Sequence, residues 1–298
     1  METPATATFL VTAPDQAGLV ARLSGFFYEL GVNILDASNH TDLHADAGPR
    51  FFMRLVVDLA CLGRAEAAAR LGGSATRKNL EAAFDELAGK LGATWSAAYS
   101  DVLPRVAILV TKDPTCLYDL VLRQRMGELR CEIPLILSNH AALEPVAESF
   151  RIPFVALPVT SETKAQQEKA LLEHIRRHHV DLVVMARYMQ ILSDDFLREA
   201  PVVINIHHGF LPAFQGAKPY HQAHARGVKL IGATAHYATK DLDQGPIIEQ
   251  DVARVNHQMG PDDLVRLGRD VERVVLARAV RAHLEKRVIV EGRRTIVL

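Results

Sequence analysis

Hydrophobic and polar positions in the first third of the chain follow the periods of a small sheet covered by helices. Alternating apolar residues mark strands, whereas Leu19, Leu23 and Phe27 recur at the spacing of an amphipathic helix that Asp15 can cap. The predicted order is strand, helix, strand, strand, helix and strand over residues 8–13, 15–30, 32–37, 51–58, 77–91 and 94–98. This βαββαβ order is typical of a ferredoxin-like domain.

The pattern changes at residue 105, where short apolar runs begin to alternate with helical segments. Five runs are expected to be buried strands, at 106–110, 133–137, 154–157, 182–186 and 202–206. Such alternation favours a Rossmann-like, mostly parallel sheet, whose ligand crevice lies at the carboxyl ends of the strands. We therefore expect an α/β protein with an N-terminal domain over 1–98, a linker over 99–104 and a second domain over 105–298.

Charge and composition narrow the range of partners. The chain has 34 Lys plus Arg residues against 35 Asp plus Glu, so it has no net field that would favour nucleic acid or an anionic membrane. It contains no run of about 20 apolar residues and no N-terminal targeting pattern. These features predict a cytoplasmic protein that binds a small molecule, with no nucleic-acid or membrane partner.

The distribution of cysteine and histidine gives no sign of a metal site. Cys61, Cys116 and Cys131 are scattered singly, which predicts buried free thiols and no disulfide framework. His221 and His224 have the spacing of metal ligands, but no third ligand accompanies them. No bound metal is therefore expected.

Three polar residues at the ends of predicted strands suggest chemistry at a carbonyl group. Asn205 and His207 share one face of an apolar strand, and Asp243 lies in a later turn before Gly245-Pro246. An amide can donate to a developing oxyanion, an imidazole can move a proton, and a carboxylate can orient the imidazole or a water. We take these three as candidate catalytic residues; for His207 alone, a structural histidine is the alternative.

The N-terminal segment resembles ACT domains. The resemblance is carried by Pro14-Asp15-Gln16-Ala17-Gly18-Leu19-Val20 and by Leu30-Gly31-Val32-Asn33-Ile34. It implies an amino-acid effector held near Asp15, Gln16, Gly18 and Asn33, and pairing of chains into a dimer or tetramer. The alternative is that Asp15 and Gly18 only cap and turn the first helix.

The second domain resembles the folate-dependent formyltransferase fold. The matching segments are 203–214, 227–229, 234–237 and 242–248, which include Asn205-Ile206-His207-His208 and Leu242-Asp243-Gln244-Gly245-Pro246. The resemblance implies that Asn205, His207 and Asp243 are catalytic. It also implies that a folate is held, largely through backbone groups, by Met189, Gln190, Ile191, Leu192, Thr239, Lys240 and Asp241. The folate is the substrate, so no cofactor is expected.

The loop after the strand at 106–110 bears on the acceptor of the formyl group. Glycinamide ribonucleotide formyltransferases have a glycine-rich run there, whose amides approach a phosphate. This chain instead has Thr111-Lys112-Asp113-Pro114-Thr115, without glycine and with a carboxylate that would repel phosphate. Water is then the expected acceptor.

An ACT domain joined to this fold resembles the formyltetrahydrofolate deformylase family. The implied reaction is hydrolysis of 10-formyltetrahydrofolate to formate and tetrahydrofolate, which supplies formate for purine synthesis and balances one-carbon pools. Two alternatives remain: transfer to an amine such as glycinamide ribonucleotide, and an amino-acid-sensing regulator with a silent catalytic domain. Gly209 departs from the family, which generally has Ser at this position, and this puts the rate in question more than the reaction.

Overall fold

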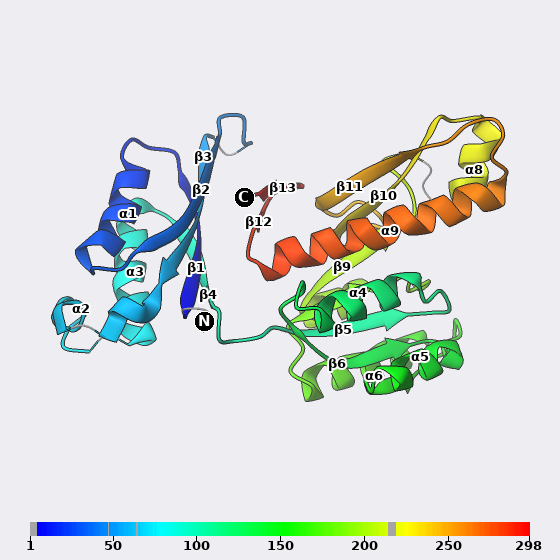
Figure 1. Cartoon of the computed structure of the whole chain (residues 1–298), viewed down its shortest axis with the longest axis horizontal. Coiled ribbons are helices and arrows are strands. Elements are labelled where there is room, and N and C mark those ends of the chain that lie inside the picture. Colours follow the sequence, from blue (N-terminus) through cyan, green and yellow to red (C-terminus); the bar gives the residue numbers. More distant parts are fainter. Residues whose placement is uncertain (1–4, 47, 64, 75, 214–218) are drawn as a thin grey trace. The chain divides into compact units, whose positions relative to one another are not determined.

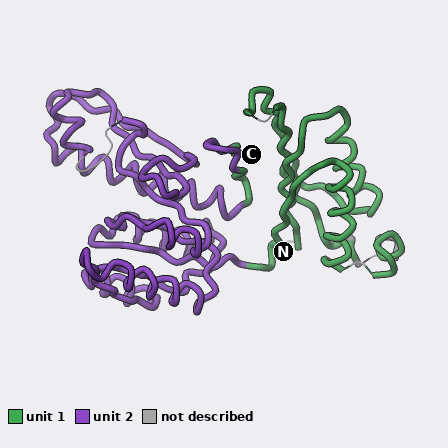
Figure 2. The backbone as a smooth tube through the Cα atoms, turned by 180° about the vertical axis from the view of Figure 1, so that it is seen from behind, with its two compact units in different colours: residues 1–102, 286–289, 296–298 green, residues 103–285, 290–295 purple. Residues whose placement is uncertain are grey.

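The computed structural model describes residues 5–298 except 47, 64, 75 and 214–218, and leaves the side chains of 61, 63 and 65–67 undescribed (Figure 1). The chain divides into two compact units (Figure 2). The first comprises 1–102 with 286–289 and 296–298, and the second comprises 103–285 with 290–295. Cys61 therefore lies outside the side chains that can be assessed, whereas Cys116 and Cys131 are buried free thiols.

The first unit contains the expected βαββαβ order around a four-stranded antiparallel sheet, with strand order β2-β3-β1-β4. Its elements are β1 Thr6–Pro14, α1 Leu19–Glu29, β2 Ile34–Asp42, β3 Arg50–Asp58, η1 Leu59–Gly63, α2 Ala65–Arg70, α3 Arg77–Leu91 and β4 Thr94–Tyr99. Every second residue of β1 is buried, and the ring of Phe9 lies 5.1 Å from Phe27 and 4.8 Å from Phe84. Aromatic packing between the sheet and both helices thus forms this core.

The start of α1 corrects one expectation. The helix begins at Leu19, after Gly18 in a left-handed conformation at φ 87°, and no side chain caps it. The backbone N–H of Asp15 instead donates to the carbonyl of Pro49 at 2.9 Å. Asp15 is therefore part of the turn that leads from β1 and is not the helix cap, since glycine adopts the required conformation without strain.

The second unit is built on a seven-stranded sheet with the order β11-β10-β9-β8-β5-β6-β7. Its strands are β5 Arg105–Val110, β6 Glu132–Ser138, β7 Phe154–Ala156, β8 Leu182–Met185, β9 Val202–His207, β10 Leu230–Tyr237 and β11 Ile247–Arg254. The pairs among β5 to β9 are parallel, whereas β10 pairs antiparallel with both β9 and β11. The predicted mostly parallel sheet is confirmed.

Helices cover this sheet, and the parallel pairing of β5 to β9 puts the carboxyl ends of these strands at one edge. They are α4 Thr115–Arg125, η2 Ala141–Leu143, α5 Glu144–Ser149, α6 Lys164–Arg177, α7 Asp194–Glu199, α8 Pro219–Arg226 and α9 Pro261–Leu284, and the hairpin of β12 Val288–Glu291 and β13 Arg294–Val297 follows. Leu109, Leu137 and Val183 form one core cluster with Leu171 of α6. The long helix α9 runs along β9, β10 and β11 and packs against α4 (Figure 1).

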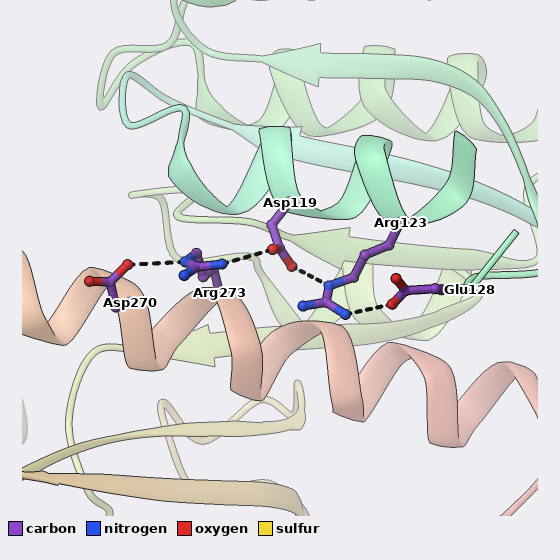
Figure 3. Close-up of polar contacts among 5 residues, drawn as sticks. All are labelled: Asp119, Arg123, Glu128, Asp270 and Arg273. Atoms are coloured by element: carbon purple, nitrogen blue, oxygen red, sulfur yellow. Dashed lines mark hydrogen bonds and ion pairs between the residues drawn. The ribbon is translucent and has the colours of Figure 1, made fainter. Parts of the chain in front are cut away.

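A chain of ion pairs fixes α9 to α4 (Figure 3). Asp119 of α4 accepts from Arg123 at 2.6 Å and from Arg273 of α9 at 3.2 Å. Arg123 also donates to Glu128 at 2.6 Å, and Arg273 donates to Asp270 at 3.1 Å. Asp119 is only 11% exposed, whereas Glu128 and Asp270 are 37% and 59% exposed, so the Asp119–Arg273 bond that joins the two helices is better shielded from water than the pairs at either end.

A glycine allows α8 to approach α9 closely. A Cβ atom built on Gly268 would lie 2.1 Å from the ring of Tyr220, which is buried in α8. Alanine is the better helix former by about 1 kcal/mol, so the choice of glycine in the middle of α9 reflects packing. This contact matters for the site described below, because Tyr220 also bonds to α9 through Glu272.

We predict that Gly268→Ala destabilises the second unit. The gain of about 1 kcal/mol in helix propensity is outweighed by an overpacking cost of roughly 1–3 kcal/mol, because the added methyl overlaps the Tyr220 ring, whose hydroxyl is bonded to Glu272. Calorimetry should show a lower midpoint for this unit. Gly89→Ala in α3 is the matched control, since no atom lies within 4 Å of its added Cβ, and it should not lower the midpoint of the first unit. Equal behaviour of the two variants would contradict the packing argument.

Candidate active site

Strand β9 and the loop after β10 bring the three candidate residues together. Asn205 and His207 lie on β9, and Asp243 lies between β10 and β11. His207 Nδ1 is 3.1 Å from Asp243 Oδ2, with the two side chains 4% and 9% exposed. The structure therefore places an imidazole and a carboxylate in direct contact at the carboxyl end of the parallel sheet, as the sequence pattern predicts.

The loop that carries Asp243 has an unusual backbone. Asp243 has φ 55°, a left-handed conformation that is uncommon outside glycine. Two residues later, a Cβ on Gly245 would lie 1.7 Å from the carbonyl oxygen of Tyr237, so only glycine fits there. The tight turn folds the carboxylate back toward β9, which explains why Asp243 reaches His207 across a long gap in sequence.

The electrostatics keep Asp243 ionised. Burial by itself would raise the pKa of this carboxyl, but the hydrogen bond from His207 and the neighbouring ring of His236 lower the pKa well below its usual range. The carboxylate is therefore negative throughout the physiological pH range. It accepts a hydrogen bond from His207 Nδ1 and can also accept one from a water.

His236 of β10 is a member of the site that sequence reasoning did not single out. Antiparallel pairing places it opposite Asn205, and it is 2% exposed. Its Nδ1 lies 2.9 Å from the carbonyl oxygen of Tyr237 and must donate a proton there, so in the neutral ring Nε2 is an acceptor. Asn205 Nδ2 lies 3.3 Å from that Nε2, and Asp243 Oδ1 lies 3.6 Å from it. The histidine thus orients the asparagine amide.

The sequence indicates that His236 is a buried polar residue, but it does not identify the partner of this histidine. It lies within the apolar strand segment Thr234-Ala235-His236-Tyr237, where a buried polar residue needs a partner. Only the register between β9 and β10 shows that the partner is Asn205.

A second polar cluster borders the histidines. Arg187 Nη1 donates to Glu272 Oε2 at 2.6 Å, and the Tyr220 hydroxyl donates to Glu272 Oε1 at 2.6 Å. Burial, and after it the charge of Arg187, lowers the pKa of the His208 ring to about 4. His208 is therefore neutral at pH 7, whereas its neighbour His207 faces a carboxylate.

Sequence reasoning also missed Glu272, although its position among apolar residues of the helix is a signal that could have identified it. The residue is fully buried on the apolar stripe of α9, four positions after Gly268 and three before Val275. A charged residue on such a stripe requires a partner of opposite charge. Its partner Arg187 comes from a loop with no periodic pattern, at φ 64°, and could not be assigned from spacing.

A cavity of about 570 Å³ opens beside the catalytic candidates, which line it together with most of the residues implied to hold a folate. Those residues are Met189, Gln190, Ile191, Leu192, Thr239 and Lys240. Met189 and Ile191 are large apolar residues that are 56% and 57% exposed, as suits a surface that packs against a ligand. Asp241 does not line the cavity; its carbonyl accepts from the Gln244 N–H and the Thr239 hydroxyl within the turn.

Gly209 lies against the catalytic imidazole. A Cβ atom on Gly209 would be 2.9 Å from His207 Nε2 and 3.2 Å from Cδ2. This Nε2 is buried and has no hydrogen-bond partner among the residues that the structure describes. With glycine at position 209, this nitrogen lacks the side-chain hydroxyl that the serine expected there from the sequence resemblance would supply.

The four residues suggested for an effector have structural contacts in the first unit. Gln16 Nε2 donates to the Leu91 carbonyl at 3.1 Å, and the Asn33 carbonyl accepts from the Asp58 N–H at 2.9 Å. Asp15 and Gly18 form the turn before α1, as described above. An amino-acid site at these residues stays a prediction.

In the part of the chain that the structure describes, no group of three His, Cys, Asp or Glu side chains is arranged to hold a metal ion. None of the helices in that part is both long enough and apolar enough to cross a bilayer.

Comparison with known proteins agrees with the geometry. The formyl transferase family matches residues 104–280. A protein of Synechocystis sp. named formyltetrahydrofolate deformylase is 52% identical over 98% of both chains. The crystal structure of a formyltetrahydrofolate deformylase from Pseudomonas syringae superposes with a TM-score of 0.92 at 41% identity, covering 100% of this chain and 95% of that one.

A transferase shares only the second unit's fold. Glycinamide ribonucleotide transformylase 1 from Symbiobacterium toebii aligns with a TM-score of 0.63 at 29% identity, covering 67% of this chain and 96% of that one. The full-length matches are therefore to deformylases, and the chain belongs to the formyltetrahydrofolate deformylase family.

Proposed function

We propose that this chain hydrolyses 10-formyltetrahydrofolate to formate and tetrahydrofolate. The observation that carries the proposal is the meeting of Asn205, His207 and Asp243 in one cavity, in a chain that matches deformylases along its whole length. These groups supply a hydrogen-bond donor to the oxyanion, an imidazole that can carry a proton, and a carboxylate that can accept a hydrogen bond from the attacking water.

The folate would occupy the cavity between two loops. Met189 to Leu192 and Thr239 to Lys240 line it, and their exposed apolar side chains and backbone groups suit a flat, polar-edged pterin. The formyl carbon would then lie near Asn205, because that residue lines the same cavity beside His207.

Asn205 would stabilise the negative charge that develops on the formyl oxygen. One N–H of its amide is directed to His236 Nε2, which leaves the second N–H for the substrate. Because His236 is fixed by its own bond to the Tyr237 carbonyl, the donor is oriented before the reaction begins.

His207 and Asp243 would manage the protons. The Asp243 carboxylate accepts a hydrogen bond from the attacking water and takes its proton as the water oxygen adds to the formyl carbon. The C–N10 bond then breaks as N10 takes a proton from His207, and formic acid leaves, losing its remaining hydroxyl proton to solvent as formate. The proton held by Asp243 then passes back to His207, 3.1 Å away, which restores both groups. The low pKa of Asp243 keeps the carboxylate charged and so favours the imidazolium that this step requires.

Transfer to an amine is the second candidate function, because the same fold occurs in a glycinamide ribonucleotide transformylase. An amino-acid-sensing regulator with a silent second unit is the third candidate, but it gives no reason for the close contact between His207 and Asp243.

We further propose that an amino acid binds near Asp15 and Gln16 and that chains pair into an oligomer. We also propose that the enzyme is cytoplasmic and supplies formate for purine synthesis.

One incubation separates these candidates. The purified protein is mixed with 10-formyltetrahydrofolate alone, and formate and tetrahydrofolate are measured. Equal amounts of both products indicate hydrolysis. No turnover until an amine is added would indicate a transferase, and no turnover under either condition would indicate a silent unit.

We predict that Asn205→Ala lowers turnover by roughly 10²–10³-fold, the usual effect of losing one oxyanion donor. Asn256→Ala is the control, since Asn256 is exposed and does not line the cavity.

His207→Ala and Asp243→Asn should each lower turnover by about 10²–10⁴-fold. If the two act as one unit, the double variant should be no slower than the slower single variant. Unchanged turnover in Asn205→Ala would remove the amide from the mechanism.

We also predict that Gly209→Ala slows turnover by roughly 10- to 100-fold, because its Cβ displaces the His207 ring from Asp243. Gly209→Ser should be several-fold faster than the alanine variant, because its hydroxyl can accept from the unpartnered Nε2. Turnover is compared at saturating substrate, with melting temperature as the check on folding. An alanine variant as fast as the parent would show that the ring has room to move.

A further inference from the structure

A cluster of four charged residues lies behind one wall of the cavity. Asp113 follows β5, Arg187 follows β8, and Arg269 and Glu272 come from α9. Arg187 lines the cavity itself, together with His208 and Tyr220, so this cluster borders the catalytic site through Arg187.

Asp113 lies at the centre of three donors. Its Oδ1 accepts from the backbone N–H of Thr115 at 3.0 Å, and its Oδ2 lies 3.0 Å from Arg269 Nε and 3.8 Å from Arg187 Nη2. Burial would raise the pKa of this carboxyl, but the Thr115 bonds and the two arginines lower it. The side chain is 12% exposed, so a fixed anion is held next to the cavity wall.

These donors are the kind that bind phosphate. Arginine guanidinium groups and backbone N–H groups are the common partners of phosphate oxygens in proteins. Here they converge on a carboxylate of the chain itself. Each arginine already has a carboxylate partner within the chain, since Arg187 pairs with Glu272 at 2.6 Å and Arg269 pairs with Asp113 at 3.0 Å.

We propose that Asp113 is a specificity-determining residue. Its carboxylate occupies the anion position formed by Arg187, Arg269 and the Thr115 N–H, and thereby excludes phosphate-bearing amine acceptors from the cavity. Water is left as the acceptor. The inference rests on the proposed hydrolysis and explains how a fold shared with a ribonucleotide transformylase can favour hydrolysis.

The proposal predicts a gain of binding when the internal anion is removed. Asp113→Ala leaves the cluster with a net positive charge and an open position. Ribose 5-phosphate should then inhibit formate release at least tenfold more strongly than in the parent enzyme, while turnover without it is retained. The double variant Asp113→Ala with Arg269→Gln should lose this sensitivity. Asp119→Ala is the matched control, since Asp119 of α4 also pairs with two arginines, Arg123 and Arg273, but neither of these lines the cavity as Arg187 does, and this variant should gain no sensitivity.

Two further arms make the outcome decisive. Asp113→Asn keeps the shape of the side chain but removes its charge, and the variant should gain an intermediate sensitivity to ribose 5-phosphate. It also replaces the alanine variant in this test if that variant does not fold. Titration calorimetry with ribose 5-phosphate reads binding directly, so a chain that releases no formate contradicts the proposed hydrolysis without obscuring this test. Parent and Asp113 variants that bind ribose 5-phosphate equally, or not at all, would overturn the proposal.

Discussion

The contact between His207 and Asp243 is the interaction on which the rest of the site depends. A buried carboxylate 3.1 Å from an imidazole is stable only when both are held in place, and the second unit is arranged to do so. The strand pairing of β9 with β10 positions the histidine, and the left-handed turn at Asp243 returns the carboxylate to it. His236 then connects this pair to the Asn205 amide.

Charge is balanced locally around this pair. Glu272 is fully buried and bonded to Arg187 and Tyr220, and α4 is joined to α9 through Asp119 and Arg273. These contacts anchor α9, from which Glu272 extends toward the site. The ring of His208 lies 5.4 Å from that of His207, and its lowered pKa leaves it neutral at pH 7, so it adds no further positive charge beside Arg187.

Much of this could be predicted from the sequence because the relevant signals are local. In β1, buried and less buried residues alternate because one face of the strand packs on the core. The strands β5 and β8 are continuous apolar runs because nearly all of their residues are buried. Asn205 and His207 share a strand face, and Asp243 follows a turn signal, so spacing together with chemistry was informative.

What could not be predicted depends on contacts between distant segments. The partnership of His236 with Asn205 requires the register of two strands, and the pairing of Arg187 with Glu272 spans 85 residues. The start of α1 was predicted wrongly because aspartate is a preferred N-cap residue, so Asp15 fits a cap on sequence grounds. In the structure, Asp15 bonds to Pro49 and Gly18 is left-handed, so the helix begins at Leu19.

The most direct test of the account is a single-turnover reaction in ¹⁸O-labelled water, with enzyme in excess over 10-formyltetrahydrofolate and no amine present. If His207 and Asp243 direct water to the formyl carbon, formate carrying one heavy oxygen should appear at the same rate as tetrahydrofolate. A formyl group that stays on the folate until an amine is supplied would contradict the account.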